Sequence, residues 1–147
     1  MKNQKGFTLV ELLAVIVILA VVILIAVTAV IPRMNDARKG AFADEAMEYI
    51  KGAQEAYVES QMEGASGTTC FTVAWLNKYK IDKKESGYTG FVEISTEAAT
   101  EGQGTAYIKN SKYMVDGESG TISKSDVAAV ASSFSKSQPS GCQDVSA

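Results

Sequence analysis

The strongest constraint on this chain is an uninterrupted apolar run near its start. Leu12 to Ile31 covers 20 residues, and Thr28 carries the only polar side chain among them. A helix needs about 20 apolar residues to cross a bilayer, whereas the sequence from Gly64 onward has the mixed composition of a water-soluble domain. The run therefore predicts a membrane or assembly helix in front of one compact domain, because 147 residues are too few for two large domains.

Charge and composition exclude several classes of function. The chain has 14 Lys and Arg against 17 Asp and Glu, and the basic residues are scattered, so the sequence predicts no nucleic-acid partner. It contains no His, which is the commonest general base and metal ligand. A Ser or Cys nucleophile would therefore lack its usual activating base. We expect a protein that is not an enzyme, with no catalytic residues, no metal site and no cofactor.

The residues around the run allow three interpretations. A conventional secretory signal would use Lys2 and Lys5 as its charged start, residues 12–26 as its apolar core and residues 27–29 as a small-residue cleavage site. A plain signal anchor would leave the helix uncut, with Glu11 at the water interface. The third interpretation gives Glu11 a function, because a carboxylate costs about 2.5 to 3.5 kcal/mol at the centre of a bilayer and needs a partner or a proton.

A cut after Gly6 would supply that partner. Phe7 would then carry a new α-amine only four residues from Glu11. A neighbouring copy of the chain could offer its amine to this carboxylate. Such a charge pair would set the register between two copies.

The nine residues from Lys5 to Leu13, KGFTLVELL, resemble the cleavage motif of type IV prepilins. The resemblance implies that a prepilin peptidase removes residues 1–6 by cutting after Gly6, and that the new amine of Phe7 is methylated. It also implies that Glu11 pairs with the first amine of an adjacent subunit. The expected course is a single-pass precursor in the cytoplasmic membrane, then assembly by a membrane machinery into a pilus on the cell surface.

A periodic apolar pattern follows the continuous run. Apolar residues recur at spacings of three and four, which predicts an amphipathic helix that ends near Gly64. The stripe consists of Phe42, Ala46, Ile50, Ala53 and Tyr57. We expect one long helix over residues 7–63, with a membrane and assembly segment at 7–31 and an amphipathic half at 32–63. Pro32 is expected to kink or loosen it.

The two halves of this predicted helix have different means of burial. The amphipathic half can pack on the domain that follows. The lower half has nothing in its own chain to pack against, so lipid covers it first and other copies cover it later. Burying about 20 apolar side chains at roughly 1.5 to 3 kcal/mol each gives a large driving force for polymerisation.

Residues 64–147 read as a small globular domain. The expected fold is α+β, with the long helix packed on an antiparallel sheet of about three strands and with short accessory helices. Val73, Leu76 and Trp75 are expected to face inward from the first accessory helix. The expected inner face of the second consists of Val127, Val130, Ala131 and Phe134. The expected helices span residues 72–79 and 123–134, and the expected strands span 88–95, 105–109 and 112–116.

Cys70 and Cys142 both follow the apolar run. If that part of the chain is exported into an oxidising space, an intramolecular disulfide is the default expectation. It would close a loop of about 70 residues, which is worth roughly 4 kcal/mol in the chain-entropy account. Free thiols or an intermolecular bond remain the alternatives.

Three functions are compatible with these patterns. The first is a pilus subunit that polymerises with its own copies for adhesion or motility. The second is a pseudopilin of a type II secretion or DNA-uptake apparatus, which would be built in the same way. The third is a membrane-anchored surface binding module, which predicts an uncut bond between Gly6 and Phe7 and a monomer in detergent.

Overall fold

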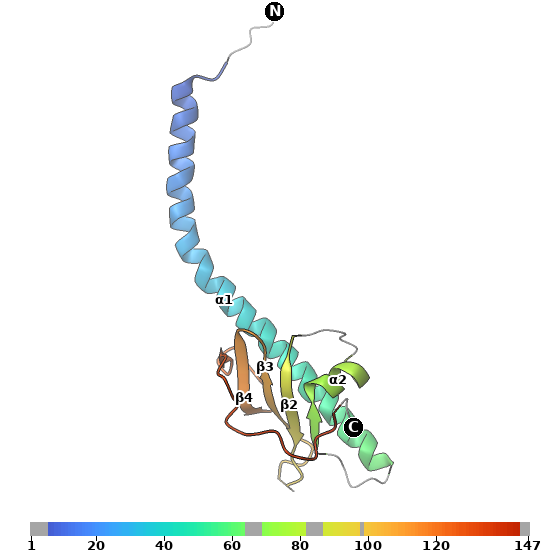
Figure 1. Cartoon of the computed structure of the whole chain (residues 1–147). Helices are drawn as coiled ribbons and strands as arrows, with labels where there is room; N and C mark the ends of the chain where they lie inside the picture. Colours follow the sequence, from blue (N-terminus) through green and yellow to red (C-terminus); the bar gives the residue numbers. More distant parts are fainter. Residues whose placement is uncertain (1–5, 64–68, 82–86, 98, 145–147) are drawn as a thin grey trace, which may run out of the picture. The chain divides into compact units, whose positions relative to one another are not determined.

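The computed structural model describes residues 6–63, 69–81, 87–97 and 99–144. Its elements follow one another along the chain as α1, β1, α2 and then β2 to β5 (Figure 1). The chain divides into two compact units with their boundary between Ala37 and Arg38. The elements are α1 Leu9–Met62, β1 Cys70–Thr72, α2 Val73–Tyr79, β2 Thr89–Ile94, β3 Gly104–Lys109, β4 Tyr113–Ser119 and β5 Ala128–Ala129.

The first unit consists of the N-terminal part of α1. The helix continues through Pro32, which has no N–H to donate to the carbonyl of Thr28. The hydroxyl of Thr28 donates to the carbonyl of Ile25 at 2.9 Å, so the only polar side chain of the apolar run is satisfied by its own helix. The surface of the run from Leu12 to Ile31 is therefore apolar on every side.

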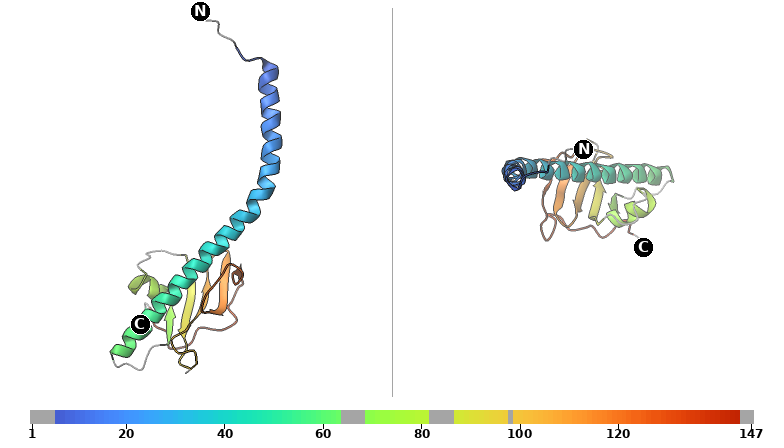
Figure 2. Two further views of the ribbon diagram at one scale, coloured as in Figure 1. Left: turned by 180° about the vertical axis from the view of Figure 1, so that it is seen from behind. Right: turned by 90° about the horizontal axis from the view of Figure 1, so that it is seen from above.

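The second unit begins at Arg38 and contains the remainder of α1. The apolar stripe predicted from the sequence is buried at every position, from Phe42 at 2% exposure to Tyr57 at 6%. Seen from above, this part of α1 lies across one face of the sheet (Figure 2). The long helix packed on an antiparallel sheet is confirmed, and the fold is α+β.

The sheet has five strands rather than about three. They are antiparallel and lie in chain order, β1-β2-β3-β4-β5, so each strand pairs with the next one along the chain. The three predicted strands are β2, β3 and β4. The two that the sequence did not reveal are the short outer strands, with three residues in β1 and two in β5.

Alternation along the strands decides which side chains meet α1. Val92 and Ile94 of β2 and Ala106 and Ile108 of β3 join the main core with the helix. Phe91, which precedes Val92, and Tyr107, which lies between Ala106 and Ile108, face the other way and form a second apolar cluster. Both faces of the central strands are therefore covered, the first by α1 and the second by the C-terminal segment of the chain.

Gly90 permits the close pairing of β2 with β3. Its φ is +130°, and a Cβ placed there would lie 1.9 Å from the backbone carbonyl oxygen of Tyr107. Only glycine fits such a position without displacing the neighbouring strand.

The first accessory helix lies where the sequence predicted it. Thr72 caps α2, because its hydroxyl accepts a hydrogen bond from the backbone N–H of Trp75 at 3.2 Å. Val73 and Leu76 are fully buried, as expected. Trp75 is half-buried between the rings of Phe71 and Tyr79, with centroid distances of 5.3 and 5.1 Å.

The prediction of a second accessory helix over residues 123–134 is wrong. The backbone N–H and hydroxyl of Ser123 donate to Asp126, but they close a turn instead of starting a helix. Ala128 and Ala129 then pair with Met114 and Tyr113 as β5. Of the predicted inner face, Val127 is buried, Phe134 joins the second apolar cluster, and Val130 and Ala131 are exposed.

An aromatic group fixes α1 to one end of the sheet. The ring of Phe42 lies 5.4 Å from that of Tyr88 and 6.0 Å from that of Tyr113. Burial and a hydrogen bond with Glu45 raise the pKa of Tyr88 well above the ordinary tyrosine value. The hydroxyl of Tyr49 donates to Asn77 at 2.7 Å and ties α1 to α2.

Candidate functional site

The start of α1 carries a reciprocal hydrogen-bonded cap. The backbone N–H and the hydroxyl of Thr8 both donate to Oε2 of Glu11 at 2.9 Å, and the N–H of Glu11 donates to the hydroxyl of Thr8 at 3.3 Å. This is a capping box, in which a residue just before the helix and the third residue after it satisfy each other's backbone donors. It places the carboxylate of Glu11 beside the residue that follows Phe7.

The structure brings together three of the site residues predicted from the sequence. Gly6 and Phe7 lie immediately before the helix in irregular backbone, and Glu11 lies in its first turn. Phe7 is 87% exposed. A Cβ on Gly6 would meet no atom within 4 Å, so the fold of this chain gives no steric reason for a glycine there. Gly6 and Phe7 are therefore both solvent-exposed in the structure.

Thr8 is the member of this site whose role sequence reasoning missed. The pattern Thr8-x-x-Glu11 in front of an apolar run is a capping-box signature, and it was visible in the sequence. The carboxylate attracted a functional interpretation because of its cost in a membrane.

Behind this cap, the side chains of the apolar segment are exposed. Its large apolar side chains expose between 46% of their surface, at Met34, and 80%, at Leu9. The first buried residue of α1 is Phe42. Among the described residues, α1 is the one helix that is long and apolar enough to cross a membrane.

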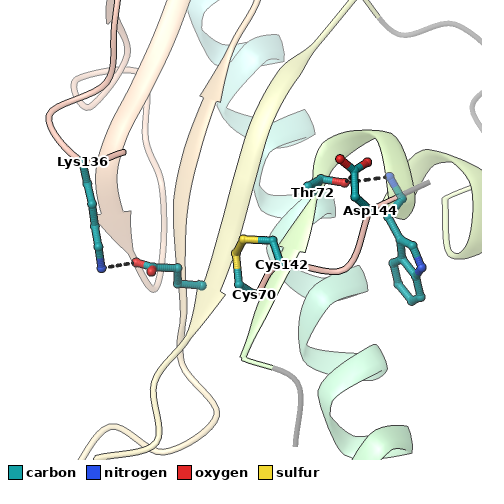
Figure 3. Close-up of a disulfide and its surroundings, with 7 residues drawn as sticks. Cys70, Thr72, Lys136, Cys142 and Asp144 are labelled. Carbon is teal, nitrogen blue, oxygen red and sulfur yellow. Dashed lines mark hydrogen bonds and ion pairs between the residues drawn. A yellow bond between two sulfur atoms is a disulfide. The ribbon is translucent and has the colours of Figure 1, made fainter. Parts of the chain in front are cut away.

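Cys70 and Cys142 form a disulfide in the structure, as predicted (Figure 3). Cys70 opens β1, and the residues around Cys142 run beside that strand. The N–H of Thr72 donates to the carbonyl of Gln143 at 3.0 Å, and the N–H of Gln143 donates to the carbonyl of Cys70 at 2.9 Å. The hydroxyl of Thr72 also donates to Asp144 at 3.3 Å. The end of the chain thus covers the outer edge of β1.

Upstream of the disulfide, the same segment is held across the outer face of the sheet. We call residues 130–144 the C-terminal strap. Nζ of Lys136 donates to Glu93 of β2 at 2.7 Å, and this hydrogen bond raises the pKa of Lys136. The N–H and hydroxyl of Ser135 donate to Asp116 of β4 at 2.9 to 3.0 Å. Phe134 meets the rings of Phe91 and Tyr107 edge-on.

The described residues contain no group of three or more side chains that could hold a metal ion. A hollow of about 350 Å³ lies between the start of β2 and the C-terminal strap. Its lining combines the ring of Phe91 with hydroxyl groups and the already paired Lys136. Such a surface could bind a partner by contact.

Comparison with known proteins finds a match, and it lies at the start of the chain. Residues 1–27 match the family described as the prokaryotic N-terminal methylation motif, which is the prepilin-type signature. No curated protein and no solved structure matches the chain significantly. The matched residues include Gly6, Phe7 and Glu11 and extend through most of the apolar run.

These observations agree on the class of protein. The signature and the apolar helix fit a precursor that is anchored in a membrane, and they point to a structural protein rather than an enzyme. The disulfide fits the same class. The chain therefore carries the prepilin-type signature, which is similar to that of type IV pilin-like and pseudopilin-type proteins, on a long helix packed against a small sheet.

Proposed function

We propose that this protein is a structural subunit of a type IV pilus, which polymerises through its apolar N-terminal helix into an extracellular filament. The observation that carries the proposal is the uncovered apolar segment from Leu9 to Met34. Transfer of this surface from water is strongly favourable at about 25 cal/mol per Å². Lipid covers it in the precursor, and copies of the same helix cover it in the filament.

The first residues give the proposed order of events. A prepilin peptidase cuts the exposed bond after Gly6, and the new amine of Phe7 is methylated. The amine of one copy then pairs with the carboxylate of Glu11 in its neighbour. This carboxylate is held in place by Thr8, so its position is set before assembly. The pair neutralises two charges that would otherwise be costly inside an apolar bundle.

The N-terminal residue of the mature protein tests the proposal. Mass spectrometry of protein from the producing cells should find a chain that begins at Phe7 with a methylated amine. A chain that begins at Met1 supports the membrane-anchored binding module instead. A chain that begins at Val30 supports a conventional secretory signal cut after Ala29.

A pseudopilin carries the same signature, so processing does not separate it from a pilus subunit. The location and length of the polymer do. Electron microscopy of cells at native expression should show long surface fibres that an antibody against this protein labels. Labelled material confined to the cell envelope would place the protein in a secretion or DNA-uptake apparatus.

A further inference from the structure

The second unit is electrically polarised along α1. At each end of the sheet, one contact shows which part of α1 lies beside it. The ring of Phe42 meets Tyr113, which follows the turn between β3 and β4. Three turns later, Nε2 of Gln54 donates to the carbonyl of Gly102 in the loop between β2 and β3, at 2.9 Å. These two ends carry opposite charge.

Basic residues gather at the Phe42 end. Arg38 and Lys39 lie one helical turn before Phe42 and Ala43, so they continue the sheet-facing side of α1 beyond the end of the sheet. Lys112 is exposed in the turn after β3. We call Arg38, Lys39 and Lys112 the basic end. The acidic groups nearby on α1 are Asp36, Asp44 and Glu45. Asp36 has an interaction of its own, and Glu45 is hydrogen-bonded to Tyr88.

Acidic residues gather at the Gln54 end. Glu97 and Glu101 are exposed in the loop that contains Gly102. Glu118 is exposed on β4 opposite Ala106, close to the same edge. We call Glu97, Glu101 and Glu118 the acidic end.

The cations near the acidic end are already engaged or lie on another surface. Lys136 is paired with Glu93 at 2.7 Å, and Lys51 lies on the exposed side of α1. Within the described part of the chain, none of the six residues of the two ends makes an ion pair with another side chain. Both ends therefore present charge that the fold of one copy does not neutralise.

We propose that the basic end of one copy docks on the acidic end of the next copy in the polymer. The inference rests on the proposed function and adds a contact between globular units to the contact between apolar helices. All copies enter the membrane in the same orientation, so neighbours displaced along the helix axis present opposite ends to each other. A contact between two different surfaces of identical subunits is head-to-tail, and it builds an open filament instead of a closed dimer.

Complementary charge suits this contact for a further reason. Oppositely charged patches steer approaching copies and fix their register, whereas like charges brought together cost several kcal/mol. The polarity of the unit therefore favours the head-to-tail arrangement and opposes head-to-head pairing of two basic or two acidic ends.

Charge reversal in the full-length chain tests this contact. One variant carries Arg38→Glu and Lys112→Glu, a second carries Glu97→Lys and Glu101→Lys, and a third carries all four changes. Each reversal at one end alone should lower the yield of sheared filaments at least about tenfold, because like charges then meet. The combined variant should recover most of the yield, because opposite charges meet again with exchanged signs.

A control changes net charge in the same direction as the basic-end variant, away from both ends. Lys78→Glu alters an exposed lysine on α2, and it should leave the yield within about twofold of the unmodified chain. An equal loss in this control would overturn the proposal, as would a combined variant no better than its parents. A wild-type chain that forms no filaments refutes the proposed function itself, so the two failures are distinguishable.

Disulfide trapping gives a second readout that does not depend on yield. One chain carries Lys112→Cys and another carries Glu101→Cys, and both are produced in the same cells. The mixed pair should give a cross-linked dimer in filaments, and each chain alone should give none. Cross-links within the Lys112→Cys chain alone would indicate a head-to-head contact and contradict the proposal.

Discussion

The side chain of Glu11 at the start of α1 has two roles, one of them in the proposed filament. Its carboxylate completes the helix end through Thr8, and in the proposed filament it also receives the amine of a neighbour. Glutamine can fulfil the first role, because the third residue of a capping box is either Glu or Gln. It cannot fulfil the second, because an amide carries no charge.

Two substitutions at Glu11 separate these roles. Glu11→Gln should keep the slow hydrogen exchange of the first-turn amides in detergent micelles, and Glu11→Ala should lose it, since a lost cap costs about 1 kcal/mol. Both variants should fail to assemble filaments on cells. Thr8→Ser is the control, because serine keeps the capping hydroxyl. Normal filaments from the Glu11→Gln variant would show that charge at this position is not needed.

At the scale of single residues, the sequence was informative where a local rule applies. The burial of Phe42 and Tyr57 followed from their helical spacing, and the disulfide of Cys70 with Cys142 followed from the expected compartment. The ion pair of Lys136 with Glu93 could not be foreseen. These residues lie 43 positions apart, and only the folded path of the C-terminal strap brings them together.

At the scale of elements, length decided which predictions succeeded. α1, α2 and the three central strands each carry enough residues to show their own periodicity. β1 and β5, with three and two residues, do not. Residues 123–134 have a capping signature and small apolar residues, but a helix of about 12 residues is marginal alone in water. For Ala128 and Ala129, pairing with the edge of β4 is more stable than the predicted helix.

Gly90 gives a direct test of how tightly β2 and β3 pair. Gly90→Ala should lower the free energy of unfolding by about 3 kcal/mol, because its Cβ meets the carbonyl of Tyr107 at a φ that L-residues rarely adopt. Urea unfolding of the purified chain in detergent, followed by the fluorescence of the single tryptophan, Trp75, measures the change.

Gly120→Ala is the matched control for this experiment. Gly120 also has a positive φ, +74°, but a Cβ there would meet no atom within 4 Å. The cost should then be only that of the backbone conformation, about 1 to 2 kcal/mol. Equal losses for the two variants would mean that the contact with Tyr107 does not determine the cost at Gly90.

At the scale of the whole molecule, the disulfide governs how firmly the C-terminal strap is held. Cys70 and Cys142 are 72 positions apart, so their bond removes much freedom from the unfolded chain. The double variant Cys70→Ser with Cys142→Ser should lose about 4 kcal/mol of stability. Unfolding in urea measures this loss, and limited proteolysis should show faster cleavage within the strap.

Lys136→Ala provides the comparison. The Lys136 side chain is about half exposed, so its pairing with Glu93 is screened by water and its loss should cost less than about 1 kcal/mol. If the double serine variant were no less stable than Lys136→Ala, the noncovalent contacts of the strap would hold it without the disulfide.

The two outer edges of the sheet affect how crowded copies of this protein interact. An open strand edge invites addition of a strand from another molecule, which is a common route to insoluble aggregates. Here the backbone of Gln143 lies against β1, and the outer strand on the other side has only two residues. In the proposed assembly pathway, precursors that are crowded together in a membrane can therefore collide often without pairing through their strand edges.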